Sequence, residues 1–333
     1  PIGLISIALP AWLAEQGAST AEIASFIAIS GLPWGFKLVA GPVMDRFSFL
    51  AMGRRRPWVV GAQFLLLAAM IAMGFVPDPA NHIVLLTWLA FLVNCGAAVQ
   101  DVAVDGMAID VLPVEERGRA NAFMAFGQVA GYSGSAALSA MALVSLGLPG
   151  ATLSLAGGIL FIFVWAVLVR ERSGERRLPW TPGEATARSI ELQAEDWRSI
   201  FANLRKVVFL PASVILVAMT FCWRATDGFW LTAAPVIAVQ QLGYASTEYS
   251  NWNAIVGFAA ATAGLLIGPV IDRRGSQRIL FGALAILAGI YLTVFLTVPL
   301  WTESWLPLLV LIIQQFVVQA LFISFIATHM NIC

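Results

Sequence analysis

The chain has 333 residues, of which 59% are hydrophobic and only 11% are charged, and its formal net charge is zero. A soluble domain carries about a quarter charged residues, so these charges are too few to cover a soluble fold of this length. The neutral balance gives no electrostatic basis for binding nucleic acid. The three cysteines, Cys95, Cys222 and Cys333, lie far apart, so neither a disulfide framework nor a zinc site is expected. We therefore expect an all-α integral membrane protein whose exterior faces the lipid bilayer.

Apolar segments recur along the chain at about 20 residues, the length of helix that crosses a bilayer core. Ten spans are predicted, near residues 1–15, 22–44, 58–76, 84–110, 121–146, 151–169, 208–240, 247–271, 279–299 and 306–330. The chain begins and ends abruptly in apolar sequence, which predicts a fragment with an incomplete first span.

Positive charges fall only in alternate connections between these spans. They are Arg46 and Arg54 to Arg56, then Arg117 and Arg119, then Arg170 to Lys206, and finally Arg273, Arg274 and Arg278. The positive-inside rule predicts that these connections are cytoplasmic, in a multi-pass protein of a cell membrane, with a bacterial inner membrane expected. In the third of them, Trp197, Phe201 and Leu204 recur at helical spacing, which fits either a helix on the inner membrane face or the start of the seventh span.

Two hexapeptides show that the chain repeats itself. Gly41 to Arg46 reads Gly-Pro-Val-Met-Asp-Arg, and Gly268 to Arg273 reads Gly-Pro-Val-Ile-Asp-Arg. Parallel repeats of six spans build one large class of transporters. We therefore predict a helix bundle over residues 1–170, a cytoplasmic linker over 171–206 and a second bundle over 207–333, from which the last two spans are missing.

The motif Gly41 to Arg46, followed by Gly53-Arg54-Arg55-Arg56, resembles the loop signature of the major facilitator superfamily, although six residues separate its two parts. Three further stretches resemble the branch of AmpG-type muropeptide permeases and acetyl-coenzyme A transporters. They are Gly31-Leu-Pro-Trp-Gly-Phe-Lys37, Gln100-Asp-Val-Ala-Val-Asp-Gly106 and Asp110-Val-Leu-Pro-Val-Glu-Glu-Arg-Gly118. The resemblance implies import of a bulky amphiphilic or sugar-containing solute, driven by protons.

Five ionisable residues fall deep inside predicted spans, where charges are costly and usually functional. They are Lys37 in the second span, Asp101 and Asp105 in the fourth, and Arg224 and Asp227 in the seventh. At 1.5 Å per residue, Lys37 lies about 12 Å, Asp105 about 10 Å and Asp101 about 16 Å from the basic end. We therefore expect ion pairs between Lys37 and Asp105 and between Arg224 and Asp227, which leaves Asp101 without a basic partner.

An unpaired buried carboxylate can bind and release a proton, so Asp101 and Asp105 are the predicted proton-coupling pair. The alternative is a structural carboxylate capped by Asn94, Gln100 or a backbone group. Basic groups at this depth can serve as counter-ions for an anionic substrate, and tryptophans can stack on its rings; the alternative for each tryptophan is packing or lipid contact. The predicted substrate-binding residues are Trp34, Lys37, Gln100, Trp223, Arg224 and Asp227.

The repeated Asp-Arg pairs, Asp45-Arg46 and Asp272-Arg273, are predicted to gate the cytoplasmic seam between the bundles, with anchoring at lipid headgroups as the alternative. For Arg54 to Arg56 anchoring is the expected role, and Asp110 is expected to be a surface charge.

The leading prediction is a proton-coupled symporter that imports an anhydro-muropeptide or a related solute and uses no cofactor. The alternatives are a transporter of acyl-coenzyme A or another organic anion, an uncoupled facilitator, and a non-transporting receptor or assembly factor. An enzyme is not expected, because the two histidines, His82 and His329, have no partner at ligand spacing. An ATP-driven pump is not expected either, because no nucleotide-binding loop of the Gly-rich Lys-Ser/Thr type occurs.

Overall fold

The computed structural model describes residues 1–112, 114–193, 196–297 and 305–330, and these residues form helices and connections without a strand. The elements in chain order are η1 (Leu4–Ala8), α1 (Leu9–Glu15), α2 (Thr20–Gly31), η2 (Leu32–Phe36), α3 (Lys37–Arg46), η3 (Leu50–Met52), α4 (Arg56–Met73), α5 (Ile83–Val111), α6 (Val114–Leu168), α7 (Ala187–Glu191), α8 (Trp197–Val208), α9 (Pro211–Val236), η4 (Ile237–Gln241), α10 (Ser246–Arg274), α11 (Ser276–Thr297) and α12 (Trp305–Met330). This all-helical architecture confirms the predicted fold class.

Five of the described helices are long and apolar enough to cross a bilayer, and a sixth span results if α2 and η2 are joined to α3 across a bend of 45°. The prediction of ten spans therefore stays a prediction. The second predicted span differs from expectation because it is not one straight helix. Gly31, Pro33 and Gly35 occupy the break, where η2 is a 3-10 turn and Lys37 begins the next helix.

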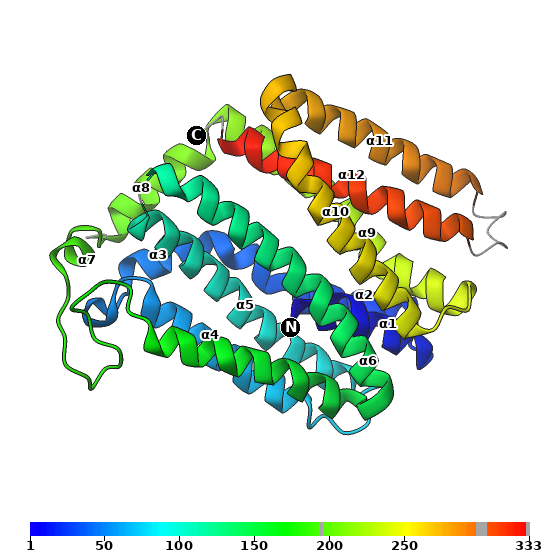
Figure 1. Cartoon of the computed structure of the whole chain (residues 1–333), viewed down its shortest axis with the longest axis horizontal. Helices are drawn as coiled ribbons and strands as arrows, with labels where there is room; N and C mark the ends of the chain where they lie inside the picture. Colours follow the sequence, from blue (N-terminus) through cyan, green and yellow to red (C-terminus); the bar gives the residue numbers. More distant parts are fainter. Residues whose placement is uncertain (113, 194–195, 298–304, 331–333) are drawn as a thin grey trace.

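The fifth and sixth predicted spans fall on one element, α6, which has a kink between them. Gly147 has the positive φ of 68° inside α6, and Pro149 follows two residues later. A proline inside a helix removes one backbone hydrogen bond and a glycine tolerates a positive φ, so the chain can reverse its direction within α6 (Figure 1).

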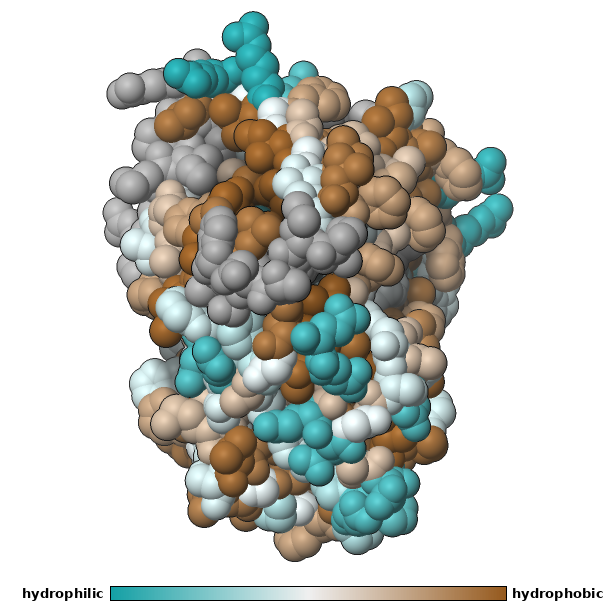
Figure 2. All heavy atoms as spheres, turned by 90° about the vertical axis from the view of Figure 1, so that its right-hand side faces the viewer, coloured by the Kyte–Doolittle hydropathy of each residue, from teal (hydrophilic) through white to brown (hydrophobic). Residues whose placement is uncertain are grey.

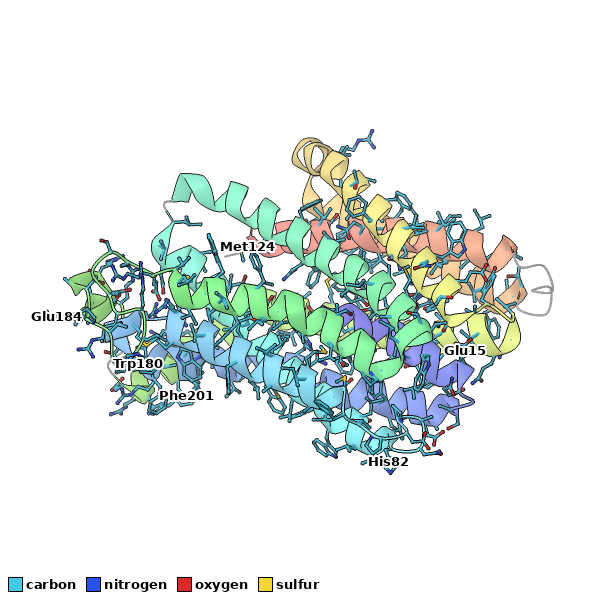
Figure 3. The ribbon with its side chains drawn as sticks, turned by 60° about the horizontal axis from the view of Figure 1, so that its bottom comes forward. Glu15, His82, Met124, Trp180, Glu184 and Phe201 are labelled. Carbon is cyan, nitrogen blue, oxygen red and sulfur yellow. The ribbon has the colours of Figure 1, made fainter. Side chains whose placement is uncertain are left out.

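The connections alternate between two ends of the molecule (Figure 1). The α3–α4 connection and the segment with α7 lie at the left, while α1–α2, α4–α5 and α9–α10 turn at the right. We call the end with Arg46 and Arg54 to Arg56 the basic end. Glu15 and His82 lie at the opposite end from Trp180, Glu184 and Phe201 (Figure 3). Figure 2 looks onto the end opposite the basic end, where hydrophilic side chains gather in the lower half.

The helices of the first half share one apolar core. Its largest fully buried side chains include Leu9, Phe26, Met70 and Leu86. A Cβ on Gly96 of α5 would lie 2.9 Å from the Ala62 carbonyl of α4, so this close packing requires glycine. A second core joins α9, α11 and α12 through Trp223, Leu280, Leu287 and Leu321.

Candidate functional site

The break in the second span places two predicted site residues against α5. Trp34, in the 3-10 turn, donates its indole N–H to Asn94 Oδ1 at 2.6 Å. Lys37 begins α3, its ammonium lies 4.5 Å from the centroid of the Trp34 ring, and it forms an ion pair with Asp101. Both charged side chains are half-buried or more, since Lys37 is 34% and Asp101 16% exposed. Asp101 is ten residues from the end of α5, which places the pair about 15 Å inside the helix.

The predicted pairing of Lys37 with Asp105 is wrong, and so is the expectation that Asp101 has no basic partner. Asp101 uses both carboxylate oxygens, because Oδ2 binds Lys37 and Oδ1 accepts the Gln128 amide at 2.9 Å. Asp105 lies one turn closer to the basic end; its side chain is exposed and forms no hydrogen bond or ion pair with the described part of the chain.

The proposed caps of Asp101 are also engaged elsewhere. Asn94 accepts the Trp34 indole, and Gln100 accepts the Gln63 amide of α4 at 2.7 Å. Gln63 is 3% exposed, and its own carbonyl oxygen has no partner among the described residues. The wall of the site is therefore a row of polar side chains from α4, α5 and α6 inside otherwise apolar helices.

The charged pair of the second half forms as predicted. Arg224 and Asp227 of α9 are joined at 3.2 Å, one helical turn apart, and the Arg224 guanidinium lies 4.9 Å from the centroid of the Trp223 ring. Trp223 itself is 8% exposed and packs against Phe322 and Phe325 of α12. This burial favours the packing alternative for Trp223 over a direct role in binding.

α6 connects the two halves next to this site. Gln128 contacts Asp101, and Tyr132, four residues later on the same face, packs against a core cluster that includes Ala234 and Tyr249 of the second half. Gly127 and Gly131 flank Gln128, and a Cβ at either position would meet no atom within 4 Å. The helix surface beside Gln128 is therefore open.

At the basic end, the expectation that Arg54 and Arg55 anchor their helices at the lipid headgroups is wrong. Both are 7% exposed. Arg54 pairs with Asp45 of α3 at 2.7 Å and with Asp110 of α5 at 2.5 Å. Arg55 pairs with the same two carboxylates, at 2.5 Å and 3.4 Å. Asp110 is 10% exposed and is therefore not a surface charge. These four side chains tie together the ends of three helices of the first half.

A carboxylate from the connection after α6 completes this cluster. The side chain of Glu171 is fully buried, and it accepts the backbone N–H groups of Arg55 and Arg56 at 2.8 and 2.9 Å. Arg56 is 3% exposed and donates its guanidinium to the carbonyls of Ala166 and Val167 at the end of α6. Because α4 has no side-chain cap of its own, Glu171 caps that helix from a distant part of the sequence.

The predicted gating residues divide into three groups. Asp45 belongs to the arginine cluster of the first half, whereas Arg46 forms no hydrogen bond or ion pair with the residues that the structure describes. The side chains of Asp272 and Arg273 lie outside the described residues.

The two halves are joined at the end opposite the basic end. Ser246 of α10 donates to Glu15 of α1 at 2.5 Å, and Gln240 donates to the carbonyls of Ala14 and Ala18, each at 3.0 Å. α6 and α10 converge toward this end and separate toward the other (Figure 1).

The sequence matches the family model of the major facilitator superfamily over residues 2–333. The chain therefore belongs to this superfamily of membrane transporters, which confirms the predicted family and places the chain with transporters rather than enzymes.

Among curated proteins, the chain is 28% identical to the "anhydromuropeptide permease" of Escherichia coli K12 over 287 residues, which cover 86% of this chain and 55% of the relative. It is 29% identical to an uncharacterized protein of Haemophilus influenzae over 121 residues, covering 36% of the chain and 28% of that protein. An uncharacterized protein of Schizosaccharomyces pombe is 26% identical over 137 residues, covering 40% and 26%. The chain thus spans about half the length of the permease that it matches.

Sequence reasoning missed Gln128 and Gln63 as site residues. The criterion that found Lys37 and Asp101, a polar group deep in an apolar segment, applies equally to these amides. Which acidic group each amide or lysine meets depends on helix rotation, and the sequence does not specify that rotation.

Proposed function

We propose that the chain forms the translocation site of a proton-coupled secondary transporter that imports a bulky anionic solute of the anhydromuropeptide type. The observation that carries this proposal is the ion pair between Lys37 and Asp101, deep in the first half and beside the open glycine face of α6. Charges at such depth are expensive to maintain and mark substrate or ion pathways.

The pair suggests how proton and solute are coupled. While Asp101 is ionised, it holds the Lys37 ammonium and competes with any anionic solute for it. A proton on Asp101, or shared with Asp105 one turn away, removes that competition and frees Lys37 to bind a carboxylate of the solute. Solute and proton then bind together, as symport requires.

The solute class follows from the neighbours of Lys37. The Trp34 ring beneath the ammonium offers an apolar face on which a sugar ring can stack, and Gln128 and Gln100 offer amide groups to its hydroxyls. A sugar-containing anion fits this set, and the name of the permease relative agrees with it. In the second half, Arg224 and Asp227 form the corresponding charged pair on α9.

Alternating access would arise from rocking of the two halves, over 1–170 and 207–333, about the site. In the described state the contacts of Glu15 with Ser246 and of Gln240 with α1 hold the halves together at one end. We propose that the basic end, with the linker 171–206, is cytoplasmic, so that this state is closed toward the outside. Asp45 and its arginine partners would then gate the seam by keeping the helix ends of the first half together.

The experiment is uptake of labelled anhydro-muropeptide by the purified protein in liposomes, with and without an inward proton gradient. Gradient-dependent uptake that is lost in Lys37→Gln, and kept in the surface variant Glu191→Gln, supports the proposal. Uptake without gradient dependence would make the protein a facilitator. Absence of uptake by folded protein, with uptake of acyl-coenzyme A instead, would assign the site to another organic anion.

A further inference from the structure

The basic end carries a groove that shares no residue with the Lys37–Asp101 site, although it includes Arg46, one of the predicted gating residues. It has a volume of about 800 Å³ and opens at the surface between the α3–α4 connection, the first turns of α4 and the middle of α5. Its lining includes the polar residues Arg46 and Ser48 and, further along α4 and α5, the apolar residues Leu65 and Val99. Trp58 lies between them, because its indole donates to the Phe47 carbonyl at 2.7 Å.

The polar end has unused hydrogen-bonding capacity. The Arg46 Nε atom and the Ser48 hydroxyl are buried, yet neither has a partner among the described residues. Arg46 also has no carboxylate within ion-pair distance in the described part of the chain, unlike Arg54 and Arg55 beside it. The half-buried Arg46 guanidinium contacts the Phe47 ring at 5.7 Å from its centroid but leaves its buried Nε–H without an acceptor, so this end of the groove is complementary to an anionic group with acceptor oxygens.

The apolar end points along the helices into the span. Leu65 is nine residues inside α4, about 14 Å from its start. Phe47, Phe49 and Leu65 are exposed large hydrophobic residues at the groove. An anion that fits here must therefore carry an apolar tail, because a free water-soluble ion would leave this wall uncovered.

A neighbouring helix places the groove at the membrane surface. The ring of Trp197, at the start of α8, packs edge-to-face with the ring of Phe47 and stacks on the ring of Phe201. The ring centroids are 5.8 Å and 5.7 Å apart, respectively. Along α8, charged residues such as Arg198 and Arg205 alternate with apolar residues at helical spacing, which is the pattern of a helix lying in the interface plane. The groove beside it thus spans the headgroup layer and the upper acyl chains.

We propose that this groove binds one anionic phospholipid, whose phosphate contacts Arg46 and Ser48 and whose acyl chains lie along Trp58, Leu65 and Val99. The lipid would fill the space between the α3–α4 connection and α5 and stabilise their packing. Its binding is independent of the transported solute.

The test is native mass spectrometry of the purified protein in detergent. The protein is titrated with phosphatidylglycerol or with phosphatidylcholine of the same acyl chains. We expect one saturable phosphatidylglycerol adduct and weaker phosphatidylcholine binding. Arg46→Gln should weaken phosphatidylglycerol binding roughly fivefold, the effect of one basic residue at an anionic membrane surface, whereas Arg46→Lys should retain it.

A second variant tests the apolar end without touching a charge. A Cβ on Gly61, in the groove, would meet no atom within 4 Å, so Gly61→Leu should narrow the groove at its apolar wall without disturbing the fold and weaken the saturable adduct. Gly157→Leu is the matched control, since Gly157 of α6 is exposed and equally unobstructed.

Three results would overturn the proposal. One is equal phosphatidylglycerol binding by wild type and Arg46→Gln, and another is an unchanged adduct in Gly61→Leu. The third is displacement of phosphatidylglycerol by inorganic phosphate at equal concentration, which would reveal a phosphate site that needs no lipid.

Discussion

Glu171→Ala should destabilise the protein, although it leaves every arginine of the basic end intact. Its buried carboxylate accepts two backbone N–H groups at the start of α4 and one guanidinium N–H, from Arg172 at 3.3 Å. A hydrogen bond to a charged group contributes about 1.5–3 kcal/mol, and a lost helix cap costs about 1 kcal/mol. Because water can enter the space left by the deleted side chain, we take the lower bound for both backbone bonds, a loss of about 3 kcal/mol.

With an entropy of unfolding of about 2 cal/mol/K per residue, that loss lowers Tm by about 4 °C. Glu171→Gln keeps one acceptor oxygen and should lose about half as much. The assay is intrinsic-fluorescence melting of the purified protein in detergent. Glu184→Ala is the control, because Glu184 is an exposed carboxylate at the same end of the molecule (Figure 3). Equal melting temperatures of Glu171→Ala and Glu184→Ala would refute the capping role.

Three further predictions concern other parts of the structure. Gly53→Ala should cost about 1–3 kcal/mol, because φ is 104° and a Cβ would lie 2.5 Å from a carboxylate oxygen of the cap; melting in detergent measures it. Glu15→Gln should weaken the contact with Ser246 and open the closed end, which a cysteine-labelling reagent would detect as faster modification of a cysteine placed at that seam. Gln128→Leu should remove the hydrogen bond that the Gln128 amide donates to Asp101 and slow uptake, without lowering Tm by more than a few degrees.

The membrane fold could be predicted from composition and from the recurrence of apolar segments, because both reflect the low dielectric of the bilayer directly. The Arg224–Asp227 pair could also be predicted, since three-residue spacing alone brings the side chains together. The partner of Lys37 could not be predicted from the sequence. Asp101 and Asp105 are one turn, about 6 Å, apart along α5, a distance that a lysine side chain spans easily. The 45° bend before α3 also changes the direction of that helix, so a depth measured along α3 is not the same level along α5.

The arginine cluster shows a different limit. Charge counting explains why Arg54 to Arg56 lie at one end of the molecule, but the same rule assigns them to the headgroups. Their burial depends on Asp110 and on Glu171, which is 115 residues further along the chain than Arg56. Such contacts come from the packing of α4 beside α6, and local sequence does not encode them.

The central claim, that protonation of Asp101 releases Lys37 for the solute, is tested most directly by separating exchange from accumulation in Asp101→Asn. The neutral amide should mimic the protonated carboxyl, so this variant should exchange labelled for unlabelled anhydro-muropeptide across the liposome membrane but fail to accumulate it on a proton gradient. Accumulation at the wild-type level by Asp101→Asn, and also by Asp105→Asn, would contradict the account.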